Sequence, residues 1–505
     1  MAILILFASC SKDITDEDNH LFESLSSSQT AITFENNLVP TEEFNMYVFR
    51  SFYNGGGVAI GDINNDGLQD IFFTGNMVSN RLYLNQGDFR FEDVTEKAGL
   101  LSEGTWTAGV SFADLTGNGL MDIYITKSGR PGGERRHNEL FINKGIPENT
   151  ETNIPIFEER SAEYGLDVTG LSTQAVFFDY DGDSDLDMYL LNTSFDAIGD
   201  YENISGEDRQ IPDPEGGSKL FRNASTIKGG KEGGFTEVTD EAGIYSSHFA
   251  FGLSASVGDL NRDGWPDIYV ANDFFERDYL YINNRDGTFR EVLEDQMNTI
   301  SLSSMGSDIA DLTNNGWPDV YVVDMYPHTE SRKKVKMQYE TFSEYQTNVE
   351  NGFHHQMTRN TLQLNLGYDP QNNGLPLFSE VSRLSGVEAS DWSWAVLMAD
   401  YDHNGYTDIY ITNGIYKDLL DQDYIKYRVD PNEIRGMIKS GRDDVIMTLM
   451  ERIPSEPVGN ILFAGVGGLE FSNRGEAWGL ADPGFSSGAA WADLDGDGAL
   501  DLVVS

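Results

Sequence analysis

Short runs of apolar or alternating residues recur along the chain, and pairs of these runs flank one acidic loop. The loop follows the pattern D-x-[DNT]-x-[DN]-[GS]-x-x-D and opens seven times, at Asp62, Asp114, Asp179, Asp259, Asp311, Asp400 and Asp493. Residues 57–61 precede the first copy and residues 71–73 follow it. Brief apolar runs that are rich in β-branched and aromatic residues and bounded by turn residues are typical of strands. Each copy therefore predicts a strand, a tight loop and a second strand.

Two further patterns follow each loop at variable distance. The first is N-x-L-[YF]-x-N, at residues 80–85, 138–143, 278–283 and 360–365, with looser copies at 218–223 and 460–465. The second is F-x-x-V-[TS]-x-x-x-G-[LI], which begins at Phe91, Phe157, Phe235, Phe289, Phe378 and Phe471, some copies being imperfect. Both alternate apolar and polar positions, so each predicts a further strand. One unit is therefore four strands.

Seven four-stranded units at unequal spacing indicate a propeller rather than a solenoid. We expect an all-β fold, a seven-bladed β-propeller of four-stranded blades with small helical insertions and an incomplete last blade. The longer units owe their extra residues to insertions near 192–217, 325–358 and 414–457, and we expect the last two insertions to be helical. Residues 1–20 would form a signal and tether, and residues 21–505 the propeller.

The number of repeats is uneven. There are seven acidic loops but only six copies of each of the other two patterns, and the sequence stops at Ser505 after the second strand of unit seven. Residues 22–26 match the start of the F-x-x-V-[TS] pattern, so we expect them to supply the fourth strand of the last blade and close the ring. We also expect the chain to be a C-terminally truncated fragment. The alternative is an open or six-bladed ring with a spare loop.

The acidic loop has the chemistry of a calcium site. Ca²⁺ prefers six to eight oxygen ligands, and alternate side chains of a tight loop point at one centre. Glycine at position 6 permits the positive φ that this turn needs. The alternative is an ordinary Asx-turn, which seven copies with aspartate at both ends disfavour. We expect up to seven Ca²⁺ ions, held by positions 1, 3, 5 and 9: Asp62, Asn64, Asp66, Asp70; Asp114, Thr116, Asn118, Asp122; Asp179, Asp181, Asp183, Asp187; Asp259, Asn261, Asp263, Asp267; Asp311, Thr313, Asn315, Asp319; Asp400, Asp402, Asn404, Asp408; Asp493, Asp495, Asp497, Asp501.

Carboxylate content differs among the loops. Loops three and seven carry four carboxylates at the ligand positions, whereas loops two and five carry two. We expect the first pair to bind calcium most strongly and the second pair most weakly. Loop three has Ser184 at position 6, and a non-glycine residue held left-handed costs about 1 kcal/mol.

Charge narrows the classes of partner. The chain has 83 acidic and 34 basic residues, a formal net charge of −49. Nucleic acids and anionic membrane surfaces are bound through cationic patches, so both are disfavoured as partners.

The single cysteine, Cys10, follows an apolar run that is too short to span a bilayer. Residues 7–10 resemble a bacterial lipobox, in which the cysteine is lipidated. We therefore expect lipidation at Cys10 and attachment to the bacterial outer membrane, at the cell surface, through that anchor alone. The alternative is an incidental cysteine in a frayed start.

Together the loops and strand patterns resemble the FG-GAP/VCBS-repeat family, whose calcium loops are like those of the integrin α-subunit propeller. Residues 52–62 and 91–95 look like the VCBS-repeat surface lipoproteins of Bacteroidota, which often carry an ASPIC/UnbV domain after the propeller. No such domain lies within this sequence. The resemblance implies a propeller fold and calcium binding, and it says less about the function of the protein.

The leading hypothesis for function is a calcium-stabilised binding scaffold that recognises a glycan or a protein at the cell surface, with specificity in the long insertions. Five tryptophans near the loops offer surfaces for sugar rings or belong to the core: Trp106, Trp265, Trp317, Trp392 and Trp394. The alternatives are a polysaccharide-acting enzyme and a structural partner in an outer-membrane uptake complex. Catalysis would need an acid/base set outside the loops, for which the only candidates are His354, His355, Arg359, Lys333, Lys334 and Lys336.

Overall fold

The computed structural model describes residues 20–102, 106–128, 136–148, 152–195, 204–224, 234–337, 340–369 and 374–505. In it the acidic loops connect antiparallel strands, as predicted. Around the first loop, β1 (Val58–Gly61) pairs with β2 (Asp70–Phe73), and Gly61 lies opposite Asp70. The same register places Ala113 opposite Asp122 and Ala492 opposite Asp501 in the second and seventh loops. Position 9 of each loop is thus the first residue of the second strand.

Six sheets have four strands each, in the order first, second, third, fourth. The third and fourth strands coincide with the two patterns predicted from the sequence, which confirms the four-stranded blade. The blades are β1, β2, β3 (Arg81–Asn85), β4 (Phe91–Asp93); β5 (Thr107–Ala113), β6 (Asp122–Lys127), β7 (Glu139–Asn143), β8 (Phe157–Glu159); β9 (Ser172–Phe178), β10 (Asp187–Asn192), β11 (Lys219–Asn223), β12 (Phe235–Glu237); β13 (Gly252–Gly258), β14 (Asp267–Asn272), β15 (Tyr279–Asn283), β16 (Phe289–Glu291); β18 (Ser307–Ala310), β19 (Asp319–Val322), β21 (Thr361–Asp369), β22 (Leu375–Glu380); β23 (Ser393–Ala399), β24 (Asp408–Asn413), β26 (Ile461–Gly467), β27 (Glu470–Asn473).

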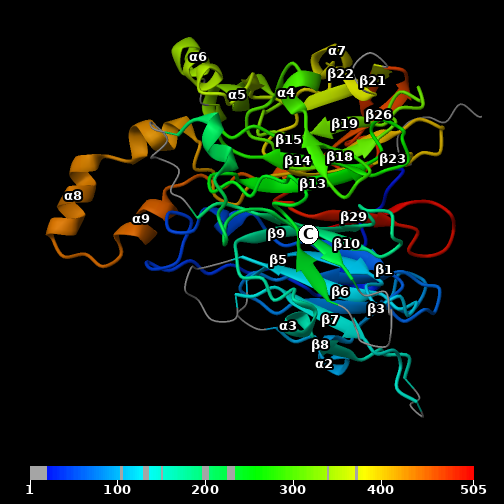
Figure 1. The fold of residues 1–505 in the computed structure, drawn as a ribbon. Coiled ribbons are helices and arrows are strands. Elements are labelled where there is room, and N and C mark those ends of the chain that lie inside the picture. The colour runs from blue at the N-terminus through cyan, green and yellow to red at the C-terminus, as the bar shows by residue number, and fades with distance from the viewer. Residues whose placement is uncertain are drawn as a thin grey trace, which may run out of the picture.

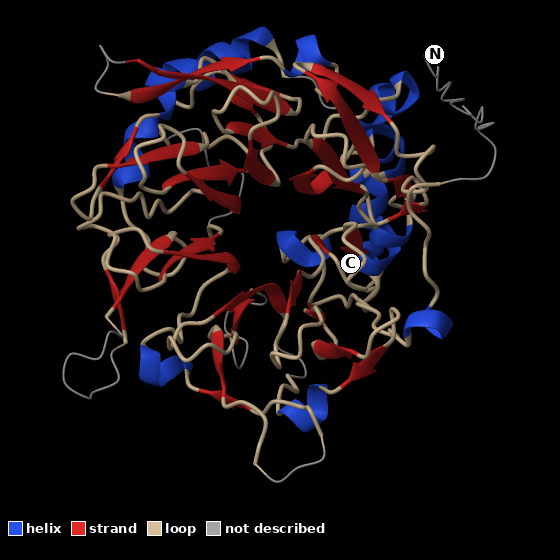
Figure 2. Cartoon of the chain, turned by 90° about the vertical axis from the view of Figure 1, so that its right-hand side faces the viewer, coloured by secondary structure: helices blue, strands red, loops and turns tan. Residues whose placement is uncertain are grey.

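The prediction of seven blades is wrong in that form, because the structure has six four-stranded blades. The seventh acidic loop joins β29 (Ala489–Ala492) to β30 (Asp501–Val504), and these two strands form a sheet by themselves. β29 contacts β23 of the sixth blade and β1 of the first, so the two-stranded sheet lies between them and the inner strands form a continuous ring. Figure 2 shows the sheets arranged around the central opening. No third strand lies beside β30 among the described residues, which is why this sheet is not a full blade.

Residues 22–26 were predicted to be a fourth strand, and this is wrong, because no third strand is present to pair with them. The segment nevertheless packs where that strand would lie. The amide of Phe22 donates to the carbonyl of Trp478, and the amide of Thr33 donates to the hydroxyl of Tyr83. The second bond matches the one from Tyr245 to the hydroxyl of Tyr281 in blade four. Residues 22–33 therefore occupy the place of a fourth-strand segment beside the first blade.

The hydrophobic core lies between neighbouring sheets rather than in one central mass. One cluster joins blades one and two through Phe72, Ile123 and Ile125, and equivalent clusters join each later pair. Two more clusters join β29 and β30 to blades six and one, and include Phe22, Ile32 and Phe34 from the N-terminal segment. Because sheets pack face to face through apolar side chains, each blade is stabilised mainly by its two neighbours.

The insertions and the acidic loops lie on opposite faces of the ring. In an antiparallel sheet, the connection from strand one to strand two and the connection from strand two to strand three are at opposite ends. The acidic loops are the first kind and the long insertions the second. Both insertions that were predicted to be helical contain helices. One holds α5 (Glu330–Lys336) and α6 (Phe342–Glu350), and the other holds η4 (Tyr424–Arg428), α8 (Pro431–Lys439) and α9 (Val445–Glu451). Helices α6, α8 and α9 lie at the left of Figure 1.

The remaining elements are short. Turns of helix follow the fourth-strand segments, and small two-stranded pairings brace the insertions. They are α1 (Ser27–Thr30), η1 (Arg50–Tyr53), α2 (Thr95–Ala98), α3 (Ser161–Tyr164), η3 (Gly206–Gln210), α4 (Leu293–Gln296), α7 (Ser382–Ser385), β17 (Ile300–Ser301) with β20 (Gln356–Met357), and β25 (Val458–Gly459) with β28 (Pro483–Gly484).

Residues 38–53 and the described parts of the three insertions form one connected structure, here termed the insertion platform. Two backbone amides of α9, those of Ile446 and Met447, donate to the carboxylate of Glu42 at 3.1 and 2.8 Å. Lys336 of α5 reaches the carboxylate of Asp421 in the next insertion at 2.8 Å. The amide of Gly206 donates to the carbonyl of Asn351 at 2.6 Å, which ties in the first insertion. Figure 1 shows these segments as blue, green and orange ribbons on one side of the ring.

Cys10 and the predicted signal lie outside the described residues. Within the described part of the chain, every helix falls short of the length and apolar character needed to cross a membrane.

Candidate functional site

The seven acidic loops share one backbone geometry. In the first loop, Oδ1 of Asp62 accepts the amide of Asp66 at 3.0 Å and Oδ2 accepts the amide of Gly67 at 2.8 Å. The aspartate at position 1 of each other loop accepts the amides of positions 5 and 6 in the same way. These bonds curl the loop around its first side chain. A carboxylate oxygen has two lone pairs, so each oxygen keeps acceptor capacity for a cation.

The aspartate at position 9 links the loop to the third strand of its blade. Oδ2 of Asp70 accepts the amide of Ile63 at 3.0 Å, and Oδ1 accepts the amide of Asn85 at 2.8 Å. The other five complete blades repeat both bonds. In the two-stranded sheet Asp501 keeps the first bond, from the amide of Leu494 at 2.8 Å. Position 9 therefore fixes the loop on the blade as well as offering it a carboxylate.

These carboxyl groups are difficult to ionise without a nearby cation. Burial raises the pKa of Asp70, Asp187, Asp267 and Asp319 to about 7, and that of Asp122 and Asp408 to about 6, against the lowering effect of the backbone amides they accept from. The neighbouring loop aspartates raise most of these pKa values further. A divalent cation at the loop would reverse both effects, because it stabilises the charged form.

Position 3 provides the clearest sign that the loops fit a cation. Oγ1 of Thr116, Oγ1 of Thr313 and Oδ1 of Asp181 are buried and have no hydrogen-bond partner within the described part of the chain. Each occupies position 3 of its loop. A buried oxygen without a partner costs free energy. An ion coordinated by oxygen ligands would satisfy all three, so the donor set fits Ca²⁺ in chemistry.

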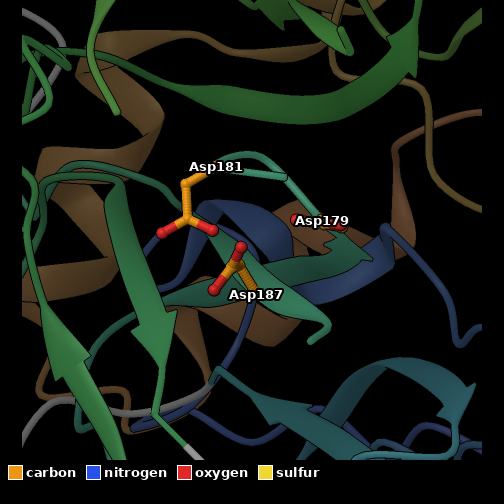
Figure 3. Close-up of side chains that lie close together, drawn as sticks. All are labelled: Asp179, Asp181 and Asp187. Atoms are coloured by element: carbon orange, nitrogen blue, oxygen red, sulfur yellow. The ribbon is translucent and has the colours of Figure 1, made fainter. Parts of the chain in front are cut away.

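The loops differ in how many carboxylates they bring together. In loop three, Asp179, Asp181 and Asp187 each offer an oxygen within 4.8 Å of the others (Figure 3). Loop six brings together the same positions, 1, 3 and 9, as Asp400, Asp402 and Asp408, whereas loop seven brings together positions 1, 3 and 5, as Asp493, Asp495 and Asp497. Loop four does not, and there Arg285 pairs with Asp263 at 2.7 Å, which places a positive charge where a cation would bind. All of the predicted ligand residues lie on these loops, on the face of the ring opposite the insertions.

The candidate acid/base residues lie in or next to the insertion between β19 and β21 of the fifth blade, and four of them make structural contacts. Lys336 is buried among carboxylates, and Arg359 pairs with Glu380 at 2.7 Å. The ring nitrogens of His354 and His355 lie 2.7 Å from the carbonyl of Met297 and the hydroxyl of Tyr345, respectively. The ring centroids of His354 and His355 lie 5.4 Å apart, and each histidine and Arg359 has a separate partner. Enzymatic activity gains no support from them.

The five tryptophans divide between the two faces. Trp265 and Trp317 belong to acidic loops four and five, and Trp317 packs on Tyr368 with ring centroids 5.7 Å apart. Trp106, Trp392 and Trp394 lie at the starts of first strands, on the insertion face. Trp106 is buried among Phe44, Phe49 and Phe52, so it belongs to the core. Trp394 lines two cavities.

Those two cavities meet at the mouth of the central channel. The channel cavity has a volume of about 480 Å³ and is lined by the inner strands, mainly by glycine, alanine, serine and threonine positions. The second cavity, of about 360 Å³, is lined by Tyr53, Trp394, Tyr416 and Phe485 together with Asn36 and Asn37. Gly55, Trp394 and Ser487 line both. Sequence reasoning missed this aromatic pocket, because its rings come from four separate segments without any shared motif.

The fold and the loops define the class: a β-propeller in which an acidic loop joins the first two strands of each blade. The family described as "FG-GAP-like repeat" matches residues 42–125 and 259–322, so these parts of the propeller are FG-GAP-like repeats. This match confirms the resemblance to FG-GAP repeats.

Among curated proteins, human integrin alpha-6 is 34% identical over 96 residues, and human integrin alpha-7 is 39% identical over 87 residues. These matches cover 17% and 14% of this chain, but only 8% and 7% of the two integrins. The chain thus matches less than a tenth of these relatives' length.

Solved structures of similar topology include an Agrocybe aegerita lectin that recognises non-reducing terminal N-acetylglucosamine. It has 13% sequence identity and a TM-score of 0.41, over 89% of this chain and 85% of the lectin. A rhamnogalacturonan lyase gives 10% identity and a TM-score of 0.37, over 89% and 70% of the two chains.

Proposed function

We propose that this protein is a calcium-stabilised extracellular binding scaffold that recognises a glycan or a protein through its insertion face. The observation that carries the proposal is the insertion platform, in which separate insertions are fixed to one another by buried contacts. Lys336 is 7% exposed and lies within 3.4 Å of Asp418, Asp421 and Glu456. Loops that carry recognition on a rigid scaffold are the usual arrangement in binding proteins. A preorganised surface also loses less conformational entropy when it binds.

Calcium would act on the opposite face, as a structural element. In blades one, two, four and five, an asparagine of the third strand donates from Nδ2 to the carbonyl at position 2 of the acidic loop of the preceding sheet, at 2.8 Å. A loop stiffened by a bound ion would therefore also hold the next blade. In this proposal the ions stabilise the ring and take no direct part in ligand binding.

We further propose attachment to the bacterial outer membrane through lipidation of Cys10, with the propeller exposed at the cell surface. The support is the apolar run and Cys10 in the sequence. Cys10→Ser should move the protein from the membrane fraction to the soluble fraction of the producing cells. If the variant stays with the membranes, the anchor lies elsewhere.

A glycan array and a pull-down with outer-membrane proteins, each with calcium and with a chelator, test the proposed function. Calcium-dependent capture of a glycan or of one protein partner is the expected result, and a protein partner alone would point to a structural role in an uptake complex. Capture that is unaffected by removing the platform helices α8 and α9 would contradict the assignment of the insertion face. Turnover of a polysaccharide would contradict a purely binding role.

A further inference from the structure

The pocket at the channel mouth is built from four aromatic rings that come together from distant parts of the chain. Tyr53 belongs to η1, Trp394 to β23, Tyr416 to the insertion after β24, and Phe485 to the loop before β29. The ring of Tyr416 lies edge-on to Phe485 at a centroid distance of 5.4 Å, and 5.7 Å from the ring of Tyr53. Tyr416 is 51% exposed and Phe485 36% exposed, so both present ring surface to solvent.

The polar side chains that line the pocket include Asn36, Asn37, Tyr53, Tyr416, Ser487 and Ser505, and the ammonium of Lys417 lies 5.6 Å from the centroid of the Tyr416 ring. Tyr53 is only 7% exposed, and it lines the pocket. Burial, followed by the nearby Tyr416, raises the pKa of Tyr53 to about 12, so its hydroxyl stays protonated. The amide of Asn37 and the hydroxyl of Tyr416 add further hydrogen-bonding groups. The lining residues include no charged side chain.

From this arrangement we infer that the pocket is a binding site for a neutral sugar unit of a glycan. A pyranose ring has apolar C–H faces and a polar rim of hydroxyls. The exposed aromatic rings can stack on the C–H faces, and the polar groups of Tyr53, Asn37 and Tyr416 can form hydrogen bonds with the hydroxyls. The volume of about 360 Å³ lies within the range of small-ligand sites. The chain's net charge of −49 disfavours an acidic polysaccharide.

The position of the pocket beside the channel cavity indicates in which direction a bound glycan would extend. Gly55, Trp394 and Ser487 line the pocket and the channel cavity alike, so the two spaces adjoin each other. Trp394 is held in place by a bond of 2.7 Å from its indole nitrogen to the carbonyl of Gly414. A glycan end seated on Tyr416 and Phe485 therefore has room to extend toward the channel rather than along the outer surface. The site would take a chain end in preference to an internal segment.

This inference rests on the proposed function, and it is tested by titration calorimetry with calcium present. The probes are neutral oligosaccharides of glucose, mannose, galactose and N-acetylglucosamine, with oligogalacturonate as the acidic counterpart. At least one neutral probe should bind. Tyr416→Ala should weaken that binding about tenfold or more, as truncation of an aromatic anchor does. Tyr53→Phe, which removes one hydroxyl and keeps the ring, should weaken it about fivefold.

Tyr368→Ala is the matched control, because Tyr368 is also 51% exposed and pairs with an aromatic ring, but on the opposite face. It should leave the affinity unchanged, and all three variants should melt close to the parent protein. Binding of a neutral probe that Tyr416→Ala and Tyr53→Phe do not alter would overturn the site while leaving the proposed function intact. Binding of oligogalacturonate alone would overturn the ligand class. Failure of every probe to bind would overturn the inference, and failure of protein capture as well would also overturn the proposed function.

Discussion

The side-chain amide of Asn85 donates to the carbonyl of Leu494 at 2.8 Å, across 409 residues of sequence. Asn85 ends the third strand of the first blade, and Leu494 is position 2 of the seventh acidic loop. The same bond links blades two, four and five to the loops of the blades before them, so the two-stranded sheet of β29 and β30 is joined to blade one as a blade would be. The ring is closed by this contact as well as by the apolar cluster around Leu494.

Asn85→Ala should lower the free energy of unfolding by about 2 kcal/mol, because it removes one buried and one partly buried hydrogen bond and leaves their acceptors unpaired. Those acceptors are the carbonyls of Leu494 and Gln69. Chemical denaturation measures the effect. Asn284→Ala, at an exposed position that bonds only to its own turn, is the control and should change stability little. Equal effects at the two positions would mean that Asn85 does not contribute to closing the ring.

Removal of calcium with EDTA should lower the melting temperature substantially, because the position 9 carboxyls would then lie buried without a cation. Asp495→Ala combined with Asp497→Ala should reduce the bound calcium by one ion per chain, measured by elemental analysis. Asp286→Ala, which changes an acidic residue outside the loops, should not. An unchanged melting curve in EDTA together with no calcium in the protein would refute the metal assignment.

Ser184→Gly should stabilise the protein by about 1 kcal/mol, since glycine adopts positive φ without the penalty of a side chain. Ser184 has φ of 76°, and the corresponding glycines of the other loops have φ between 82° and 92°. The reverse change, Gly264→Ser, should cost a similar amount, because a Cβ there meets no atom within 4 Å and only the backbone conformation is strained. Melting in saturating calcium measures both. Destabilisation by Ser184→Gly would show that the serine hydroxyl has a role that the backbone geometry does not reveal.

Lys336→Met should destabilise the platform by about 3 kcal/mol or more, because it leaves buried carboxylates without their cation. Burial by itself would lower the pKa of Lys336, but the bond to Asp421 and the charges around it raise that pKa overall, so the lysine is charged. Limited proteolysis in the segment 414–457 should become faster. Lys334→Met, at an exposed position of the same helix, serves as the comparison. If both variants resist protease alike, the ion pairs do not hold the platform.

Stability should fall as the pH rises from about 4 to about 7, in part through Asp278. Burial raises the pKa of Asp278 from 3.8 to about 7 in spite of bonds from Tyr269, Asn272 and Ser304. The folded protein therefore keeps this carboxyl protonated at pH values where the unfolded chain ionises it. Its stabilising contribution is full below pH 3.8 and lost above pH 7.

Asp278→Asn should flatten this dependence, measured as the difference in unfolding free energy from the parent protein between pH 5 and pH 8 in saturating calcium. Glu96→Gln, at an exposed position, should give a difference that does not vary with pH. A slope unchanged by Asp278→Asn would place the titrating group elsewhere.

The repeated elements could be predicted from the sequence because each has a local cause. Strand, loop and glycine positions follow from alternation and from the φ that the turn requires, and the structure has them where the pattern predicts. The number of complete blades could not be predicted in the same way, because residues 22–26 match a fourth strand but need a neighbour to become one. The channel-mouth pocket could not be predicted from the sequence either, since Tyr53, Tyr416 and Phe485 meet only after the ring has closed.

The N-terminal segment determines how the molecule would respond to tension. Residues 20–37 of the described chain precede the platform, and residues 22–33 among them are held by the bond from Phe22 to Trp478, the bond from Thr33 to Tyr83 and apolar packing. A pull applied ahead of His20 would load this segment first and peel it from β30 and blade six. The pocket wall at Asn36, Asn37 and Tyr53 follows in sequence and would be loaded next. A glycan bound there would therefore lie beside the segment that yields first under force.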